Sequence, residues 1–352
     1  MLKHTFTFYF LAILTISVVC RAADAERASY LIFQLDNDLF TGSDRSYTSG
    51  ARLAWLQPIS RESMNDFQGF LRKLSGAERN FFAHLTNFID PEKIEYDCGT
   101  GLTQLMFTPE DYSAPAAPPG QRPYAGWLGL EFSLHAKDGQ ALSSVLLSIG
   151  TTGKNAFAEE VQEWVHRNIS DSPIFQGWDS QIPGELTINL HFDRKNRFTA
   201  LAEASRDWLV AVDGYWEWGA AIGNFRTDAY VGAMVRLGYH LPVQYVTPRL
   251  QLGNYSHELS LPSDGDTGAW SVYAFGGVRG TVVAHDITID GPLFRNYDTP
   301  VSSEAWVGAM VAGVGIRWQR MNFTFSRTFR TEEYETQDGG HQFGSALVSL
   351  GF

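Results

Sequence analysis

The sequence predicts an all-β fold, namely a single closed antiparallel transmembrane β-barrel of about 12 strands, with a short helix in an outer-side loop. Three observations support this prediction. Beyond residue 25 no apolar run is long enough for a spanning helix, which needs about 20 residues. Short segments of alternating polarity recur along the chain, together with 33 glycines and 14% aromatic residues. The last strand ends on an aromatic residue.

The alternation is clearest between residues 230 and 241, which read YVGAMVRLGYHL. Every second residue from Val231 to Tyr239 is apolar or aromatic, and the other face includes Arg236 and His240. A soluble β-sandwich would turn the apolar face inward, whereas a membrane barrel turns it outward to lipid. Alternation alone does not separate these two architectures.

The closing segment FGSALVSLGF favours the barrel. Ala346, Val348, Leu350 and Phe352 share one face of this strand, with Phe352 at its end. Aromatic girdles mark the interfaces of membrane barrels, and a terminal phenylalanine resembles the assembly signal of bacterial outer-membrane barrels. We therefore expect a multi-pass protein of the bacterial outer membrane, whose C-terminal strand is recognised by the barrel-assembly machinery.

The first residues have the pattern of an export signal. Lys3 precedes an apolar run from Phe6 to Cys20, and Ala23-Asp24-Ala25 has the small-x-small form of a cleavage site. We expect residues 1–25 to be cleaved and residues 26–352 to form the barrel. A membrane anchor is the alternative, but it needs a longer apolar run. The formal net charge of -12 argues against a nucleic acid partner.

Strands are expected wherever alternation lies between turn residues. They are 28–38, 49–57, 98–108, 124–135, 141–150, 185–202, 209–224, 229–241, 269–284, 303–318, 321–330 and 341–352. The number is even, as closed bacterial barrels require. With both termini on the periplasmic side, the odd-numbered connections face outward, which gathers the loops 37–48, 109–124 and 151–184 at one rim. Residues 59–94 fall on the other side, either as an interfacial helix or as a helical hairpin that closes the base.

The third outer loop contains a predicted helix from about residue 156 to 168. Its apolar stripe consists of Phe157, Val161, Trp164 and Val165. A different face carries Glu159, Gln162 and His166. The spacing therefore places one imidazole on a rigid element at the rim, although a histidine on such a helix is often merely solvated.

The first outer loop is unusually polar, since residues 35–55 read LDNDLFTGSDRSYTSGARLAW. Asn37 and Asp38 are neighbours, so in a regular strand they point to opposite faces. If both serve one site, the strand must end or bulge there, or one of them acts through its backbone.

Ester hydrolysis is the chemistry that these groups favour. A neutral imidazole can take a proton from water, and a bound divalent cation can polarise a carbonyl. Asp38, with oxygens from Asn37, Thr48 and nearby backbone, is a hard oxygen set that suits Ca²⁺ better than Zn²⁺. The sequence has no G-x-S-x-G, H-E-x-x-H or EF-hand pattern. A serine nucleophile such as Ser43 or Ser49 remains an alternative.

Five motifs in order resemble the outer-membrane lipid A deacylase (LpxR) family. They are NDLFTGSDRSYTSGARLAW (residues 37–55), RPYAGWL (122–128), EEVQEWVH with GWDSQ (159–181), AAIGNF with GAMVRLG (220–238) and FRTEEYETQDGGHQFGSALVSLGF (329–352). The resemblance covers nearly the whole chain beyond the signal. It implies a twelve-stranded barrel that removes the 3′-linked acyloxyacyl group of lipid A in a Ca²⁺-dependent hydrolysis.

The resemblance also implies roles for individual residues. The family's Asn-Asp pair falls on Asn37 and Asp38, its threonine on Thr48, and its helix glutamine and catalytic histidine on Gln162 and His166. His166 would activate water, Asp38 would help hold Ca²⁺, and Asn37 and Thr48 would shape the site.

The second outer loop departs from the family pattern. Many relatives have Asp where this chain has Gln121, and residues 109–121 contain no lysine. Arg122 and Tyr124 are then expected to bind the substrate, with Arg122 at a lipid A phosphate.

Two alternative functions remain: an outer-membrane phospholipase acting on glycerophospholipids, and a non-enzymatic barrel that serves as a channel or scaffold.

Overall fold

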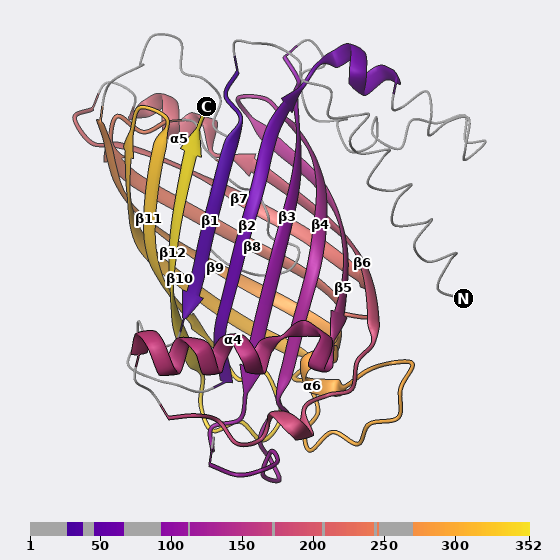
Figure 1. Cartoon of the computed structure of the whole chain (residues 1–352). Helices are drawn as coiled ribbons and strands as arrows, with labels where there is room; N and C mark the ends of the chain where they lie inside the picture. The colour runs from indigo at the N-terminus through magenta and orange to yellow at the C-terminus, as the bar shows by residue number, and fades with distance from the viewer. Residues whose placement is uncertain are drawn as a thin grey trace.

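A computed structural model describes residues 27–37, 46–66, 93–111, 113–170, 173–205, 208–242, 245 and 270–352. Twelve antiparallel strands form one closed barrel in which each strand pairs with its sequence neighbours (Figure 1). The strands are β1 (Tyr30–Asn37), β2 (Ser46–Ile59), β3 (Glu95–Thr108), β4 (Ala125–Lys137), β5 (Ala141–Thr152), β6 (Leu186–Arg197), β7 (Ala211–Gly223), β8 (Arg226–Tyr239), β9 (Trp270–Asp286), β10 (Trp306–Trp318), β11 (Met321–Arg330) and β12 (His341–Gly351). The predicted architecture and the twelve strands are confirmed, except that the sixth strand was predicted too long: it ends at Arg197, and residues 199–204 form a helix instead.

The barrel closes between its first and last strands. β1 pairs with β12 from Tyr30 opposite Gly351 to Asn37 opposite Gly344, so that no strand edge is left unpaired. The backbone N–H of Phe352 donates to the carbonyl of Ser29, at 2.9 Å. The start of β1 and the end of β12 therefore lie at the same end of the barrel, which we call the terminal end.

The described helices are short. They are η2 (Gly153–Ala156), α4 (Ala158–Val165), the π-helical η3 (His166–Ser170), η4 (Trp178–Ser180), α5 (Thr199–Ala204) and α6 (Ile287–Asp290), together with a helical turn over residues 61–66. Helices α4 and α6 lie at the end opposite the terminal end, which we call the α4 end, whereas α5 lies at the terminal end (Figure 1). Among the described residues, no helix is both long and apolar enough to cross a bilayer.

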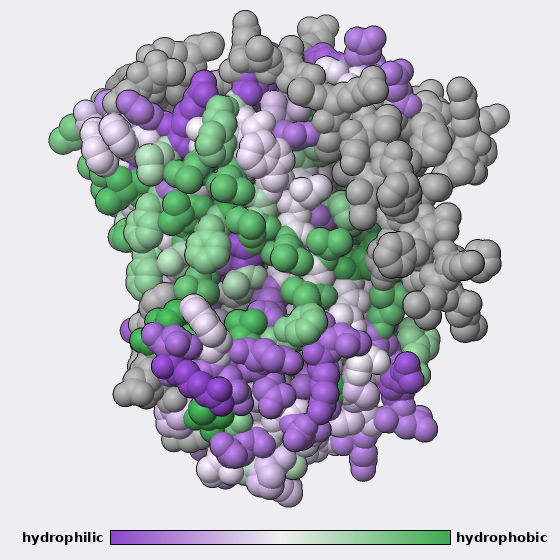
Figure 2. Space-filling view, in the orientation of Figure 1, coloured by the Kyte–Doolittle hydropathy of each residue, from purple (hydrophilic) through white to green (hydrophobic). Residues whose placement is uncertain are grey.

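The two faces of the wall differ as a membrane barrel requires. On β1, Phe33 is 48% exposed, whereas its neighbours Ile32 and Gln34 are buried in the interior. Figure 2 shows apolar side chains over the middle of the strands and hydrophilic side chains around the α4 end. The interior is polar and charged: Arg52 Nε lies 2.7 Å from Glu131 Oε2, and Arg279 Nη2 lies 2.6 Å from Glu217 Oε1. Polar residues inside and apolar residues outside are typical of barrels in lipid.

Several predictions fall on residues outside the described part of the chain. They concern the signal segment 1–25, the ligand Asp38 and most of the 59–94 segment. Of that segment, residues 61–66 are helical.

Candidate active site on the outward face of the barrel

Helix α4 lies against the outward face of the wall at the α4 end, and glycine makes this close approach possible. A Cβ added to Gly126 of β4 would lie 2.6 Å from the Cβ of Ala158, which is closer than side-chain atoms can approach. Gln104 of β3 donates from Nε2 to the carbonyl of Ala156, at 2.6 Å. A buried cluster of Met106, Tyr124, Ala158, Phe175 and Trp178 fills the space between helix and wall.

The residues under the helix belong to one row across four strands. Asn37 of β1 pairs with Ser49 of β2, Ser49 pairs with Met106 of β3, and Met106 pairs with Gly126 of β4. Because strands lie about 4.8 Å apart, this row spans roughly 14 Å from Gly126 to Asn37.

The helix runs along this row. In Figure 1, α4 extends across the strand ends from β4 toward β1, and it contacts β4 and β3. A rise of 1.5 Å per residue carries the chain about 12 Å from Ala158 to His166. This path therefore brings His166 toward the ends of β1 and β2, where Asn37 lies.

The helix turns its polar face toward the barrel. Gln162 and His166 are each only 4% exposed, whereas Phe157 and Trp164 are 54% and 59% exposed. A helix on a soluble protein would bury its aromatic side chains. Exposure of the aromatic side chains is the arrangement expected where the surroundings are lipid, and it leaves the amide and the imidazole enclosed between helix and wall.

His166 is held in one orientation. Its Nδ1 lies 2.6 Å from the carbonyl oxygen of Pro173, and its ring meets that of Phe175 edge-on at 5.4 Å between centroids. A carbonyl oxygen only accepts, so Nδ1 carries the hydrogen and the neutral ring keeps its lone pair on Nε2. Nε2 makes no hydrogen bond to any described residue. The π-helical turn that begins at His166 is of a kind that occurs often at functional sites.

Gln162 lies one turn before His166 on the same face. Its Oε1 accepts a 2.7 Å hydrogen bond from Nε1 of Trp178. Trp178 in turn packs edge-on against Tyr124, with 5.2 Å between ring centroids. Burial raises the pKa of Tyr124 to about 12. The Tyr124 hydroxyl therefore stays neutral at physiological pH. Binding of the substrate by Tyr124 stays a prediction.

The polar turn between β1 and β2 is partly described. β1 ends at Asn37, and the pairing of β2 with β3 shifts register between Tyr47 and Ser49, so Thr48 is the bulged residue. The strand that pairs with β1 therefore bulges at this turn, while Asp38 lies outside the described residues. Phe33 faces outward, and alternation along β1 gives Asn37 the same outward direction. The wall face that carries Asn37 is therefore the one that α4 covers.

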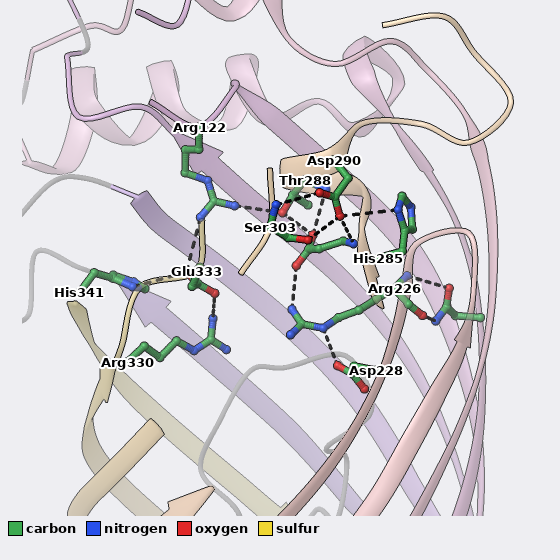
Figure 3. A network of polar contacts seen from close by, with 12 residues as sticks. Arg122, Arg226, Asp228, His285, Thr288, Asp290, Ser303, Arg330, Glu333 and His341 are labelled. Atoms are coloured by element: carbon green, nitrogen blue, oxygen red, sulfur yellow. Dashed lines mark hydrogen bonds and ion pairs between the residues drawn. The ribbon is translucent and has the colours of Figure 1, made fainter. Parts of the chain in front are cut away.

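Arg122 lies elsewhere, inside the barrel (Figure 3). Its Nη2 donates to Thr288 Oγ1 at 2.9 Å, and its Nη1 lies 3.6 Å from Glu333 Oε2. Its guanidinium also lies over the ring of Phe107, 4.4 Å from the centroid. The Arg122 side chain is 1% exposed. Contact with a phosphate would require this network to open, so substrate binding by Arg122 stays a prediction. Through its contacts with Thr288 and Glu333, Arg122 links the outer loops to one another inside the barrel.

The donor chemistry at the outward site fits a hard cation. The described residues contain no group of three or more His, Cys, Asp or Glu side chains that could hold a metal ion, and the predicted ligand Asp38 lies outside them. Asn37 pairs with Ser49 at the end of the outward row, so its amide offers a neutral oxygen beside the predicted carboxylate. Neutral oxygens of this kind, joined by one carboxylate, suit Ca²⁺ and not Zn²⁺.

Sequence reasoning missed several residues that build the site. Pro173 acts through its carbonyl oxygen, which carries no residue-specific signal. Gly126 and Met106 look like ordinary barrel residues, and only the helix above them gives them a role. Trp178 lies within the GWDSQ motif, which marked it as unusual, but the motif did not predict its hydrogen bond to Gln162.

Fold and site together define a bacterial outer-membrane β-barrel with an enclosed polar site on its lipid-facing wall. A model of the family described as outer membrane protein LpxR matches residues 8–352. The chain belongs to this LpxR family of outer membrane proteins.

Among solved structures, the chain is similar to LpxR from Salmonella typhimurium, with a TM-score of 0.69 and 19% identity over 92% of this chain and 100% of that one. It also matches the β domain of the Bordetella autotransporter BrkA, with a TM-score of 0.42 and 9% identity over 92% of this chain and 97% of that one. Comparison with curated proteins gives no match. At 19% identity, the likeness to the Salmonella structure shows the fold alone.

Proposed function

We propose that this protein is a lipid A 3′-O-deacylase, a carboxylic ester hydrolase that removes the 3′-linked acyloxyacyl group in the outer leaflet. Membership of the LpxR family supports an outer-membrane enzyme that modifies lipid A. The observation that carries the proposal is the orientation of His166, whose Nδ1 is held at 2.6 Å by the Pro173 carbonyl. This leaves Nε2 as a base on the outward wall.

The reaction begins with a water molecule at His166. Nε2 takes a proton from the water as its oxygen attacks the ester carbonyl carbon, and Nδ1 keeps its bond to the Pro173 carbonyl throughout. When the tetrahedral species collapses, the bond from the acyl carbon to the sugar 3′ oxygen breaks, and the imidazolium returns the proton to that oxygen. The products are the free acyloxyacyl acid and lipid A with a 3′ hydroxyl.

The residues around His166 would shape the site, hold the cation and keep bulk water out. Asn37 and Thr48 lie at the strand ends toward which α4 carries His166, and we expect them to shape the site. Asp38 and neighbouring oxygens would hold Ca²⁺, which supplies charge stabilisation for the developing oxyanion when it is bound. Enclosure of Gln162 and His166 between helix and wall strengthens such electrostatic interactions because it removes water.

A site on the outward face fits a lipid substrate. Lipid A can approach sideways from the outer leaflet, since its scissile ester lies at the border of sugar and acyl chains. The interior of the barrel is filled by buried ion pairs such as Arg52 with Glu131, so the substrate need not enter the lumen.

Mass spectrometry of lipid A and phospholipids tests this proposal. Cells with the protein, supplied with Ca²⁺, are expected to lose the 3′ acyloxyacyl mass from lipid A, and cells without it keep that mass. Unchanged lipid A together with new lysophospholipid would contradict the proposal and favour a phospholipase.

A further inference from the structure

The indole of Trp178 is buried and fixed by its neighbours. Trp178 is 1% exposed, and its ring meets that of Tyr124 edge-on. A Cβ added to the preceding Gly177 would lie 2.2 Å from a ring carbon of Tyr124, so the backbone before Trp178 is pressed against the same tyrosine. An aromatic ring packed on this many sides has one orientation, and the direction of its N–H group is therefore set.

That N–H group selects one end of the Gln162 amide. An indole nitrogen only donates, so it bonds the oxygen Oε1 and not the nitrogen Nε2. The observed bond is 2.7 Å long. Nε2 then points the other way, and it is buried without a hydrogen-bond partner among the described residues. Such a buried donor is unusual in a native protein and points to a partner that binds there.

The free donor lies near the proposed base. Gln162 and His166 are four residues apart, and both are buried on the face of the helix that meets the wall. A donor at this place can bond an oxygen of the ester that His166 Nε2 is set to hydrolyse. If the amide turned over, its carbonyl oxygen would face that same oxygen and repel it.

We infer that Trp178 is a positioning residue that fixes the Gln162 amide with its N–H donors toward the ester carbonyl oxygen of the substrate. The inference rests on the proposed function and deepens it. Trp178 does not touch the reacting atoms; it acts only through Gln162. If Trp178 only supported the fold, its replacement would lower activity by the same factor whether residue 162 was glutamine or alanine.

The test uses the full-length protein in detergent micelles with purified lipid A and Ca²⁺, at pH 8. Turnover is followed by mass spectrometry, and heat-modifiable migration on gels reports the folded barrel. The variants are Trp178→Phe, Gln162→Glu, Gln162→Ala, the double variant Trp178→Phe with Gln162→Ala, and Trp164→Phe. Trp164 lies on the exposed face of the same helix, so Trp164→Phe is the matched control.

Trp178→Phe is expected to lower kcat about tenfold with KM nearly unchanged, because the lost contact acts in the transition state. Gln162→Glu keeps the acceptor for Trp178 but has no N–H donor, so its kcat is expected to fall about 100-fold. In the Gln162→Ala background, Trp178→Phe should have no further effect. Trp164→Phe should keep the wild-type kcat.

Two results would overturn the inference while leaving the proposed function intact. One is wild-type kcat in folded Trp178→Phe or in Gln162→Glu. The other is an equal loss from Trp178→Phe with and without Gln162. Gln162→Glu keeps the test decisive if Trp178→Phe does not fold. A wild type that releases no fatty acid from lipid A, yet migrates as a folded barrel, would overturn the proposed function and this inference with it.

Discussion

Nδ1 of His166 lies 2.6 Å from the carbonyl oxygen of Pro173, within the same outer loop. In many hydrolases a carboxylate fixes the tautomer of the catalytic imidazole, whereas here a main-chain oxygen does so. The carbonyl orients the ring without adding a charge. The site is thereby built from one loop folded onto a rigid wall.

The approach of α4 to the wall depends on Gly126. A methyl group at this position would lie 2.6 Å from the Cβ of Ala158 and 3.2 Å from that of Ala156, so Gly126→Ala should lift the helix. We expect deacylation to fall at least about tenfold, since a displacement near 1 Å is enough to disrupt catalytic geometry. The matched control is Gly280→Ala in β9, where an added Cβ meets nothing within 4 Å. Equal activity of the two folded variants would contradict the assigned role of Gly126.

Removal of Ca²⁺ should abolish turnover. Chelation with EGTA is expected to stop lipid A deacylation, and Ca²⁺ but not Zn²⁺ should restore it, because the proposed donors are hard oxygens. Asp38→Asn should raise the Ca²⁺ concentration needed for half-maximal activity, since one carboxylate is lost. Calcium titration of the activity measures both effects. Full activity in EGTA would show that no such ion is needed.

The loop network around Glu333 predicts a pH effect on stability. Burial acts to raise the pKa of this carboxyl, but Arg330, His341 and Arg122 outweigh it and lower the pKa to about 2. Because the folded pKa lies below the unfolded one, the stabilisation is complete above about pH 4.5 and is lost as pH falls to about 2. The shift corresponds to a contribution on the order of 3 kcal/mol.

The matched pair Glu333→Gln and Glu332→Gln isolates this contribution, since Glu332 is exposed and Glu333 is buried. At pH 7 the temperature of barrel unfolding in detergent should drop by several degrees for Glu333→Gln only. The difference from wild type should shrink between about pH 4.5 and 2. A difference that stays constant over this range would contradict the role of the charge.

The filled interior predicts that the protein conducts poorly. Buried ion pairs such as Arg52 with Glu131 and Arg279 with Glu217 lie on the inner wall of the described strands. Buried side chains such as Ile32 of β1, Tyr215 of β7 and Tyr273 of β9 form one cluster in the interior, and the Tyr245 hydroxyl lies 3.0 Å from the carbonyl of Asp138. Planar bilayers containing the wild type should show no stable ion conductance, whereas a porin prepared in the same way should. Steady channels that persist in His166→Ala, with no deacylation by either protein, would support a passive channel instead.

The sequence predicted the barrel well because alternation is a local property of each strand. The same alternation could not show that Met106 and Gly126 are covered by a helix, since a lipid-facing and a helix-facing residue look alike in a strand. For α4 the spacing separated an aromatic stripe from a face with Gln162 and His166. Which face meets the wall depends on whether the surroundings are water or lipid. The partners Pro173 and Trp178 depend on a loop path that no periodicity describes.

The most direct test of the central claim is the lipid A mass spectrum of cells that make either wild-type protein or His166→Ala in equal folded amounts. Loss of the base should lower deacylation at least about 100-fold, so the variant should leave the 3′ acyloxyacyl group in place. Arg167→Ala is the matched control, since Arg167 is exposed and pairs with Glu163, and it should deacylate as the wild type does. Lipid A that loses its 3′ acyloxyacyl group equally in wild type and His166→Ala would contradict the account.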